Sequence, residues 1–92
     1  MQYRLGGGFE KILKRCHPAE RMEIQRNVDA LVRAFEARKL PVGFGIKKLV
    51  GTLWEFRIDL ATRILFQWEK QTVTFLFVGN HNEVRQFLKH YL

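Results

Sequence analysis

The spacing of apolar residues changes once along the chain and divides it into a helical half and a strand-rich half. In the first half apolar residues recur every three to four positions, which is the period of one helix face. The first stripe comprises Phe9, Ile12, Leu13 and Cys16, and the second comprises Ile24, Val28, Leu31, Val32 and Phe35. Pro18 suits the first turn of the second helix, which ends at the Pro- and Gly-rich loop of residues 38–45. Two helices are therefore predicted, after a short strand at residues 2–5 that the glycines at 6–8 interrupt.

The second half contains three runs with the character of strands. In residues 53–59 and 62–68 apolar and polar side chains alternate, the pattern of a strand with one face in water. Residues 72–78 are apolar at nearly every position, so this run is predicted as a central strand covered on both faces. A last helix follows, since the helical spacing returns at Val84, Phe87, Leu88 and Tyr91.

The order β-α-α-β-β-β-α predicts one α+β domain over residues 1–92. Its expected architecture is a small antiparallel sheet with the N-terminal helix pair packed on one face, followed by a C-terminal helix. Amphipathic helices must bury their apolar stripes on the sheet, so one sheet face is covered. The other face can then stay open for a ligand.

Two arginines are predicted to share that open face. Residues directly opposite each other in a hairpin point the same way, and two registers fit the pattern: Arg57 opposite Arg63, or Asp59 opposite Arg63. Both registers put the two arginines on one face and gather the apolar side chains on the other. Lys47 and Lys48 lie just upstream of the first of these strands. Such a set of cations suits a phosphodiester backbone, because guanidinium groups grip phosphate oxygens and ammonium groups add point charges.

The overall charge agrees with a polyanionic partner. Sixteen Lys and Arg against nine Asp and Glu give a net charge of +7, and the surplus is spread over both halves of the chain. A folded body this basic indicates nucleic acid or an acidic protein as partner. The alternative is a basic surface that serves only solubility, in which Arg57 pairs with Glu55 or Asp59.

Cysteine usage and hydropathy indicate where the protein works. The single cysteine, Cys16, cannot form an internal disulfide, which suits a reducing compartment, and its place on an apolar stripe indicates a core residue. No apolar run approaches the roughly 20 residues that a membrane-spanning helix needs. The first residues lack the apolar segment of a signal peptide. A cytoplasmic location without membrane association is expected.

One histidine stands where a strand gives way to a helix. Asn80 is predicted to cap the last helix, with Glu83 three residues on as in a capping box, so His81 takes the first helical position. Helix-terminal amides bind anions, and a histidine changes charge near neutral pH, which suits the proton transfers of RNA cleavage. The alternative is a histidine that only makes local hydrogen bonds, which is how we interpret His17 and His90.

The ordered set of these segments resembles the RelE/ParE toxin superfamily of bacterial type II toxin–antitoxin systems, over nearly the whole chain. "GGGFEKILKR" resembles the exit of the family's first strand and its first helix. "KKLVGTLWEFRI" resembles its basic loop, glycine and arginine-bearing strand, and "TRILFQW" the next strand. "VGNHNEVRQFL" resembles the end of the last strand and the C-terminal segment.

The resemblance implies an endoribonuclease that cleaves messenger RNA on the ribosome and needs neither a metal nor a cofactor. His81, Arg57 and Lys47 match positions of catalytic residues in the family. RNA-binding positions are matched by Lys48, Arg63, Arg85 and Phe87. Phe87 stands where some members have tyrosine, and Arg85 where others have an aromatic residue.

Two further functions are compatible with the same resemblance. One is a ParE-like toxin that inhibits DNA gyrase by binding it, which would not need His81. The other is an inactive relative that only binds an antitoxin or RNA. For a toxin, the implied partner is a cognate antitoxin whose acidic segment covers the basic face or packs on the helices.

Overall fold

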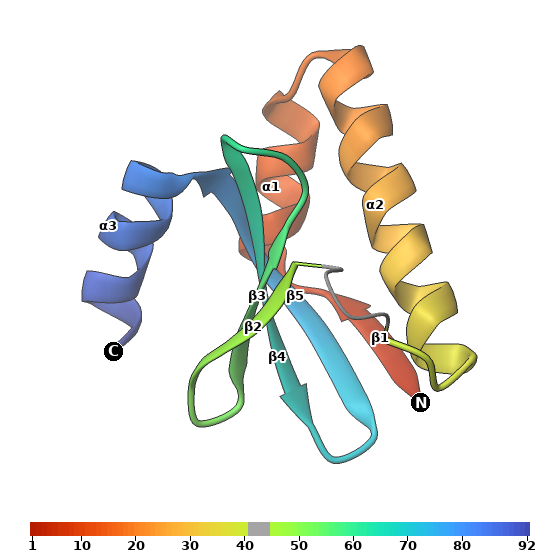
Figure 1. Cartoon of the computed structure of the whole chain (residues 1–92). Helices are drawn as coiled ribbons and strands as arrows, with labels where there is room; N and C mark the ends of the chain where they lie inside the picture. The colour runs from red at the N-terminus through yellow and green to blue at the C-terminus, as the bar shows by residue number, and fades with distance from the viewer. Residues whose placement is uncertain (41–44) are drawn as a thin grey trace.

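The computed structural model, which describes residues 1–40 and 45–92, contains one five-stranded sheet and three helices (Figure 1). The chain order is β1 (Gln2–Leu5), α1 (Gly7–Arg15), α2 (Pro18–Glu36), β2 (Ile46–Val50), β3 (Leu53–Arg57), β4 (Thr62–Glu69), β5 (Thr72–Asn80) and α3 (His81–Tyr91). The α+β class and all predicted elements are confirmed. The glycine run behaves differently from the prediction, because Gly7 and Gly8 begin α1.

The strand β2 was not predicted. Residues 46–50 were expected as a loop, but they pair antiparallel with β3 at one edge of the sheet. The adjacent Lys47 and Lys48 hide the strand in the sequence, since two consecutive polar residues break the alternation. Lysines are common on edge strands, where they discourage pairing with another chain.

The sheet has the order β1-β5-β4-β3-β2. Residues 53–80 form the predicted antiparallel meander, with β5 in an interior position. The first strand adds a parallel pair, since β1 runs alongside β5 in the same direction. The whole sheet is therefore mixed rather than purely antiparallel.

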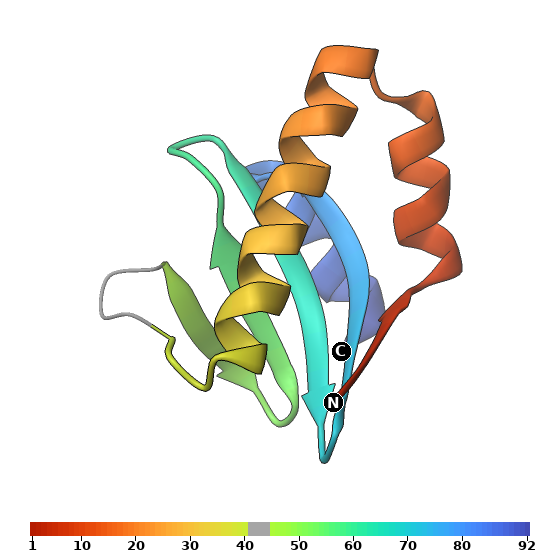
Figure 2. The same ribbon diagram turned by 90° about the vertical axis from the view of Figure 1, so that its right-hand side faces the viewer.

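Helices lie on both faces of the sheet. Figures 1 and 2 show α1 and α2 together on one face and α3 alone on the other. The expectation that the second face stays open is therefore only partly right, because α3 covers some of it. Among the described residues, no helix combines the length and the apolar character that crossing a membrane requires.

Two apolar clusters hold these layers together. The larger cluster lies between the helix pair and the sheet and includes Phe9, Leu31, Phe35, Phe56, Ile64, Phe66 and Phe75. The smaller one lies under α3, where Val84 meets Leu53 and Leu65, with Leu49, Leu76, Phe77, Phe87 and Leu88 packed against it. The apolar character of residues 72–78 is explained by this arrangement, because β5 serves both clusters.

An irregularity in β5 supplies the second cluster. Leu65 of β4 pairs with Phe77, but the next residue, Phe66, pairs with Phe75, so Leu76 is an extra residue in the strand. In such a β-bulge two residues of one strand oppose one residue of its partner. Both Leu76 and Phe77 join the cluster under α3.

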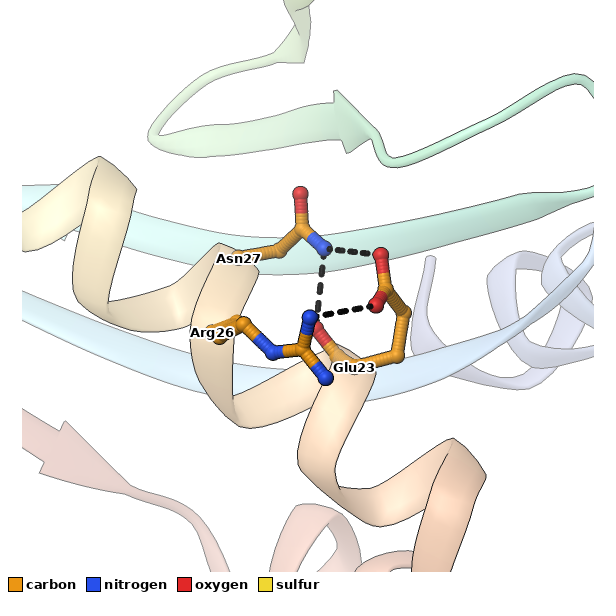
Figure 3. A network of polar contacts seen from close by, with 3 residues as sticks. All are labelled: Glu23, Arg26 and Asn27. Carbon is orange, nitrogen blue, oxygen red and sulfur yellow. Dashed lines mark hydrogen bonds and ion pairs between the residues drawn. The ribbon is translucent and has the colours of Figure 1, made fainter.

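The outer surface of α2 is polar. There Arg26 lies 3.6 Å from Glu23, and the Asn27 amide donates hydrogen bonds to the carbonyl and the carboxylate of Glu23 (Figure 3). Both charged side chains are more than half exposed. An exposed pair of this kind adds little stability.

Candidate functional site

The two arginines of the meander lie on one sheet face, as the hydrophobic pattern predicts. Arg57 of β3 and Arg63 of β4 are directly opposite each other, which is the first of the two registers considered. The intervening loop is held by Asp59, whose Oδ1 accepts hydrogen bonds from the amides of Thr62 (2.7 Å) and Ala61 (2.8 Å). Those bonds, the one from Thr62 above all, lower the pKa of the Asp59 carboxyl.

The two lysines of β2 lie on opposite faces. Lys47 pairs with Glu55, and Lys48 pairs with Trp54. Because paired residues share a face, Lys47 lies on the face of the arginines and Lys48 on the face of the helix pair. Lys48 therefore does not belong to the expected group of four cations on one face.

Glu55 forms an ion pair with Arg63 on this face. Arg63 Nη1 lies 3.3 Å from both carboxylate oxygens of Glu55, and the two side chains are 16% and 8% exposed. The sequence pattern assigned Glu55 to a water-exposed face, so its burial was missed. Glu55 is opposite the buried Leu65, and burial of this kind depends on tertiary packing that the alternating pattern does not show.

The side chain of Arg57, by contrast, is accessible to a ligand. Its side chain is exposed, and in the part of the chain that the structure describes no carboxylate pairs with its guanidinium. The alternative in which Glu55 or Asp59 neutralises Arg57 is not observed. Glu55 is bound to Arg63, and Asp59 holds loop amides.

His81 stands at the end of the neighbouring strand. The predicted capping box is present: Asn80 Oδ1 accepts from the Glu83 amide, and Glu83 Oε1 accepts from the Asn80 amide, each at 2.8 Å. His81 is thus the first residue of α3, and it is exposed. Helices begin with free amide groups, so an anion near His81 would also meet the positive end of α3.

Gly79 brings this helix start close to the arginines. It pairs with Arg63, which pairs with Arg57, so Arg57 and Gly79 are two strand spacings apart, about 10 Å. A Cβ at Gly79 would lie 3.0 Å from Glu83 and from Phe77. The absence of a side chain there allows the first turn of α3 to sit directly against the strand.

The two remaining predicted residues lie on different flanks of α3. Arg85 is one turn after His81, so both lie on the same flank, and both are exposed. Phe87 lies on the other flank, stacked between Phe77 (4.7 Å between ring centroids) and Tyr91 (5.4 Å). The three rings, with Glu83, Gln86 and His90, line an apolar groove of about 500 Å³.

The described geometry joins Lys47, Arg57 and the start of α3 at one end of one sheet face. This end of the face carries an exposed guanidinium, an ammonium group and an imidazole. Such groups can bind a phosphodiester and move its protons. Arg85 extends the set along α3. Arg63 lies within the set but is bound to Glu55.

Comparisons with known proteins find this fold among solved structures. No protein-family description and no curated protein sequence matches the chain. The structure of YafQ from Escherichia coli strain BL21(DE3) has a TM-score of 0.68 at 12% identity, over 90% of this chain and 96% of that one. The RelB–RelE antitoxin–toxin complex from Methanococcus jannaschii gives 0.68 at 17% identity, over 91% and 96%.

A third similar structure is the DinJ–YafQ toxin–antitoxin complex of E. coli, with a TM-score of 0.69 at 14% identity over 90% of this chain and 94% of that one. At such identities a likeness establishes the arrangement of the backbone, whereas function depends on individual side chains. The predicted superfamily resemblance is confirmed at the level of the fold. This chain has the fold of the RelE and YafQ toxins of toxin–antitoxin systems.

Proposed function

We propose that this protein is the toxin of a type II toxin–antitoxin system and acts in the cytoplasm as an endoribonuclease that cleaves messenger RNA on the ribosome. The observation that carries the proposal is the placement of Arg57: exposed, without a carboxylate partner among the described residues, and on the sheet face that ends at His81. The fold supports the same function, since it is that of toxins named RelE and YafQ.

The reaction uses a nucleophile that RNA itself provides. A base removes the proton of a ribose 2′-hydroxyl, its oxygen attacks the adjacent phosphorus, and the bond to the 5′-oxygen of the next nucleotide breaks. An acid then protonates that oxygen, which leaves a 2′,3′-cyclic phosphate and a 5′-hydroxyl. Because the nucleophile is already held beside the phosphorus, proton transfer and charge stabilisation are the tasks left to the protein.

Each side chain of the site has a role in this scheme. Arg57 stabilises the negative charge that develops on the phosphorane. His81 acts as acid or base, and Lys47 takes the other proton transfer or holds the RNA backbone. Arg85, on the flank of His81, meets the backbone beyond the scissile bond, and Phe87 offers a ring for a base. Lys48 contacts RNA only where the strand passes over the β2 edge, since it lies on the other face.

A cognate antitoxin is the second partner. Two of the similar structures are complexes of a toxin with its antitoxin. With a net charge of +7, this chain is suited to an antitoxin segment rich in Asp and Glu. By covering Arg57 and Lys47, that segment would compete with RNA.

Expression in bacteria without an antitoxin tests the function. Protein synthesis, messenger integrity and DNA supercoiling are followed in the same culture. The proposal expects synthesis to stop as messengers are cut, while supercoiling is unchanged. Relaxed DNA with intact messengers would instead identify a gyrase inhibitor, and no effect on any of the three would identify an inactive relative.

A further inference from the structure

Glu55 is an acidic residue in the centre of a basic site. It is 6% exposed, and it is the one buried charged residue in the part of the chain that the structure describes. A buried carboxylate is costly unless it is paired, and among the described residues the partner of Glu55 is Arg63. The pairing uses a single nitrogen, Nη1, for both oxygens.

Arg63 is held in a position that does not suit it for binding a phosphate. Its Nε is buried and has no hydrogen-bond partner among the described residues. Its side chain is 16% exposed, whereas Arg57 directly opposite it is exposed. The two arginines are directly opposite each other in the hairpin, and like charges in directly opposite positions of a sheet repel.

Glu55 lies diagonally opposite Arg63 and directly opposite Lys47. Lys47, Arg57 and Arg63 together with Glu55 form a group with a formal charge of +2. Without Glu55 the charge would be +3, and Arg63 would be free to turn toward any phosphate bound by Arg57.

We propose that Glu55 is a positioning residue of the cleavage site: it ties Arg63 to the sheet, so that Arg57 alone meets the scissile phosphate. The inference rests on the proposed function and assigns Arg63 an indirect role in place of the RNA contact that the superfamily resemblance implies. Glu55 touches neither RNA nor the reacting atoms. It fixes which of two neighbouring arginines does.

Glu55→Gln tests this directly, because it keeps the shape of the side chain and removes its charge. The released Arg63 adds a phosphate contact, so binding of a 2′-O-methyl RNA oligonucleotide, which lacks the nucleophile, becomes tighter. The dependence of log K on log salt becomes steeper by up to about 0.7. Cleavage of messenger on ribosomes becomes slower by about 100-fold, the loss that a misplacement of the reacting group by about 1 Å can cause.

Two variants separate this role from others. Glu69→Gln makes the same change at an exposed residue at the far end of β4, so it should leave binding, salt slope and cleavage as in the wild type. Glu55→Gln with Arg63→Gln removes both partners. Because no competing arginine is released, the double variant should recover most of the cleavage rate and the wild-type salt slope.

Two results would overturn the inference. Wild-type salt slope and cleavage rate in Glu55→Gln would show that Glu55 positions nothing. A double variant as slow as Glu55→Gln would show that Arg63 acts on the RNA itself. If the wild type binds RNA without cutting it, the proposed function fails, but the comparison of salt slopes between Glu55→Gln and Glu69→Gln still decides the role of Glu55.

A measurement on the wild-type protein covers the case in which Glu55→Gln does not fold. The Nε–H resonances of the arginine side chains are followed by ¹⁵N NMR while the 2′-O-methyl RNA is added. The resonance of Arg57 should shift, and that of Arg63 should stay in place with slow hydrogen exchange. A shift of Arg63 equal to that of Arg57 would refute the inference.

Discussion

At the scale of single residues, His81 distinguishes a catalytic site from a basic surface. It is exposed, its side chain makes no hydrogen bond with a described residue, and the capping box that fixes the helix start uses Asn80 and Glu83 instead. The structure thus gives His81 no task in the fold. A side chain with chemical capacity and no structural task is a candidate for proton transfer.

His81→Gln is the sharper of two substitutions at this position. Glutamine keeps hydrogen bonding but cannot move a proton at neutral pH, so cleavage of messenger on ribosomes should fall about 10²–10⁴-fold. His81→Ala should show the same loss, with thermal stability and antitoxin binding nearly unchanged for both. Cleavage by His81→Gln at close to the wild-type rate would make His81 a bystander.

The lysines of β2 give a matched pair for RNA binding. Lys47 shares a face with Arg57, and Lys48 lies on the opposite face. Lys47→Ala should therefore reduce the salt slope of RNA binding by about 0.7, the value for one phosphate contact on a single strand. Lys48→Ala should leave it unchanged. An equal effect of both variants would show that RNA wraps around the β2 edge.

At the scale of elements, the sequence pattern was reliable wherever a stripe or an alternation was uninterrupted. It predicted both N-terminal helices, the meander, the capping box and the shared face of Arg57 and Arg63. It failed at β2, where two lysines conceal the strand. Without β2 there was no register for Lys47 and Lys48, so their separation onto two faces could not be predicted.

The turn between α1 and α2 depends on one arginine. Arg21 of α2 donates hydrogen bonds to the carbonyls of Leu13 (2.8 Å), Lys14 (3.3 Å) and Cys16 (3.2 Å), at the end of α1. Carbonyls in the last turn of a helix have few backbone donors, although the Leu13 carbonyl also accepts from the Cys16 amide (3.3 Å). The positive charge of Arg21 suits the helix C-terminus. Arg21 thereby joins the two helices that cover one sheet face.

Arg21→Met keeps much of the side-chain volume and removes the donors. It should lower the free energy of unfolding by about 1.5–3 kcal/mol, the range for hydrogen bonds to a charged group. Arg26→Met is the control on the same helix, since it removes only the exposed contact to Glu23, and should change stability by less than about 0.5 kcal/mol. Urea denaturation measures the free energy of unfolding of both variants. Equal losses of stability would show that the Arg21 hydrogen bonds do not hold the two helices together.

At the scale of the whole molecule, the sheet has two different faces. The helix pair closes one face with the larger apolar cluster. On the other face α3 covers only part of the sheet, and Arg57, Lys47 and the first residue of α3, His81, are exposed. The sequence predicted the first face well, because it is defined by local periodicity. It could not predict which part of the second face α3 covers, because the position of α3 depends on the bulge in β5 and on Gly79.

We propose that this second face cleaves RNA by internal attack of the 2′-hydroxyl, and the chemical ends of the fragments distinguish this reaction from others. Purified protein is added to ribosomes programmed with a messenger, and both ends of each fragment are identified by mass spectrometry. We expect 2′,3′-cyclic phosphate and 5′-hydroxyl ends, which are absent when Arg57→Gln replaces the wild type. Fragments with 5′-phosphate ends, or equal cleavage by Arg57→Gln, would contradict it.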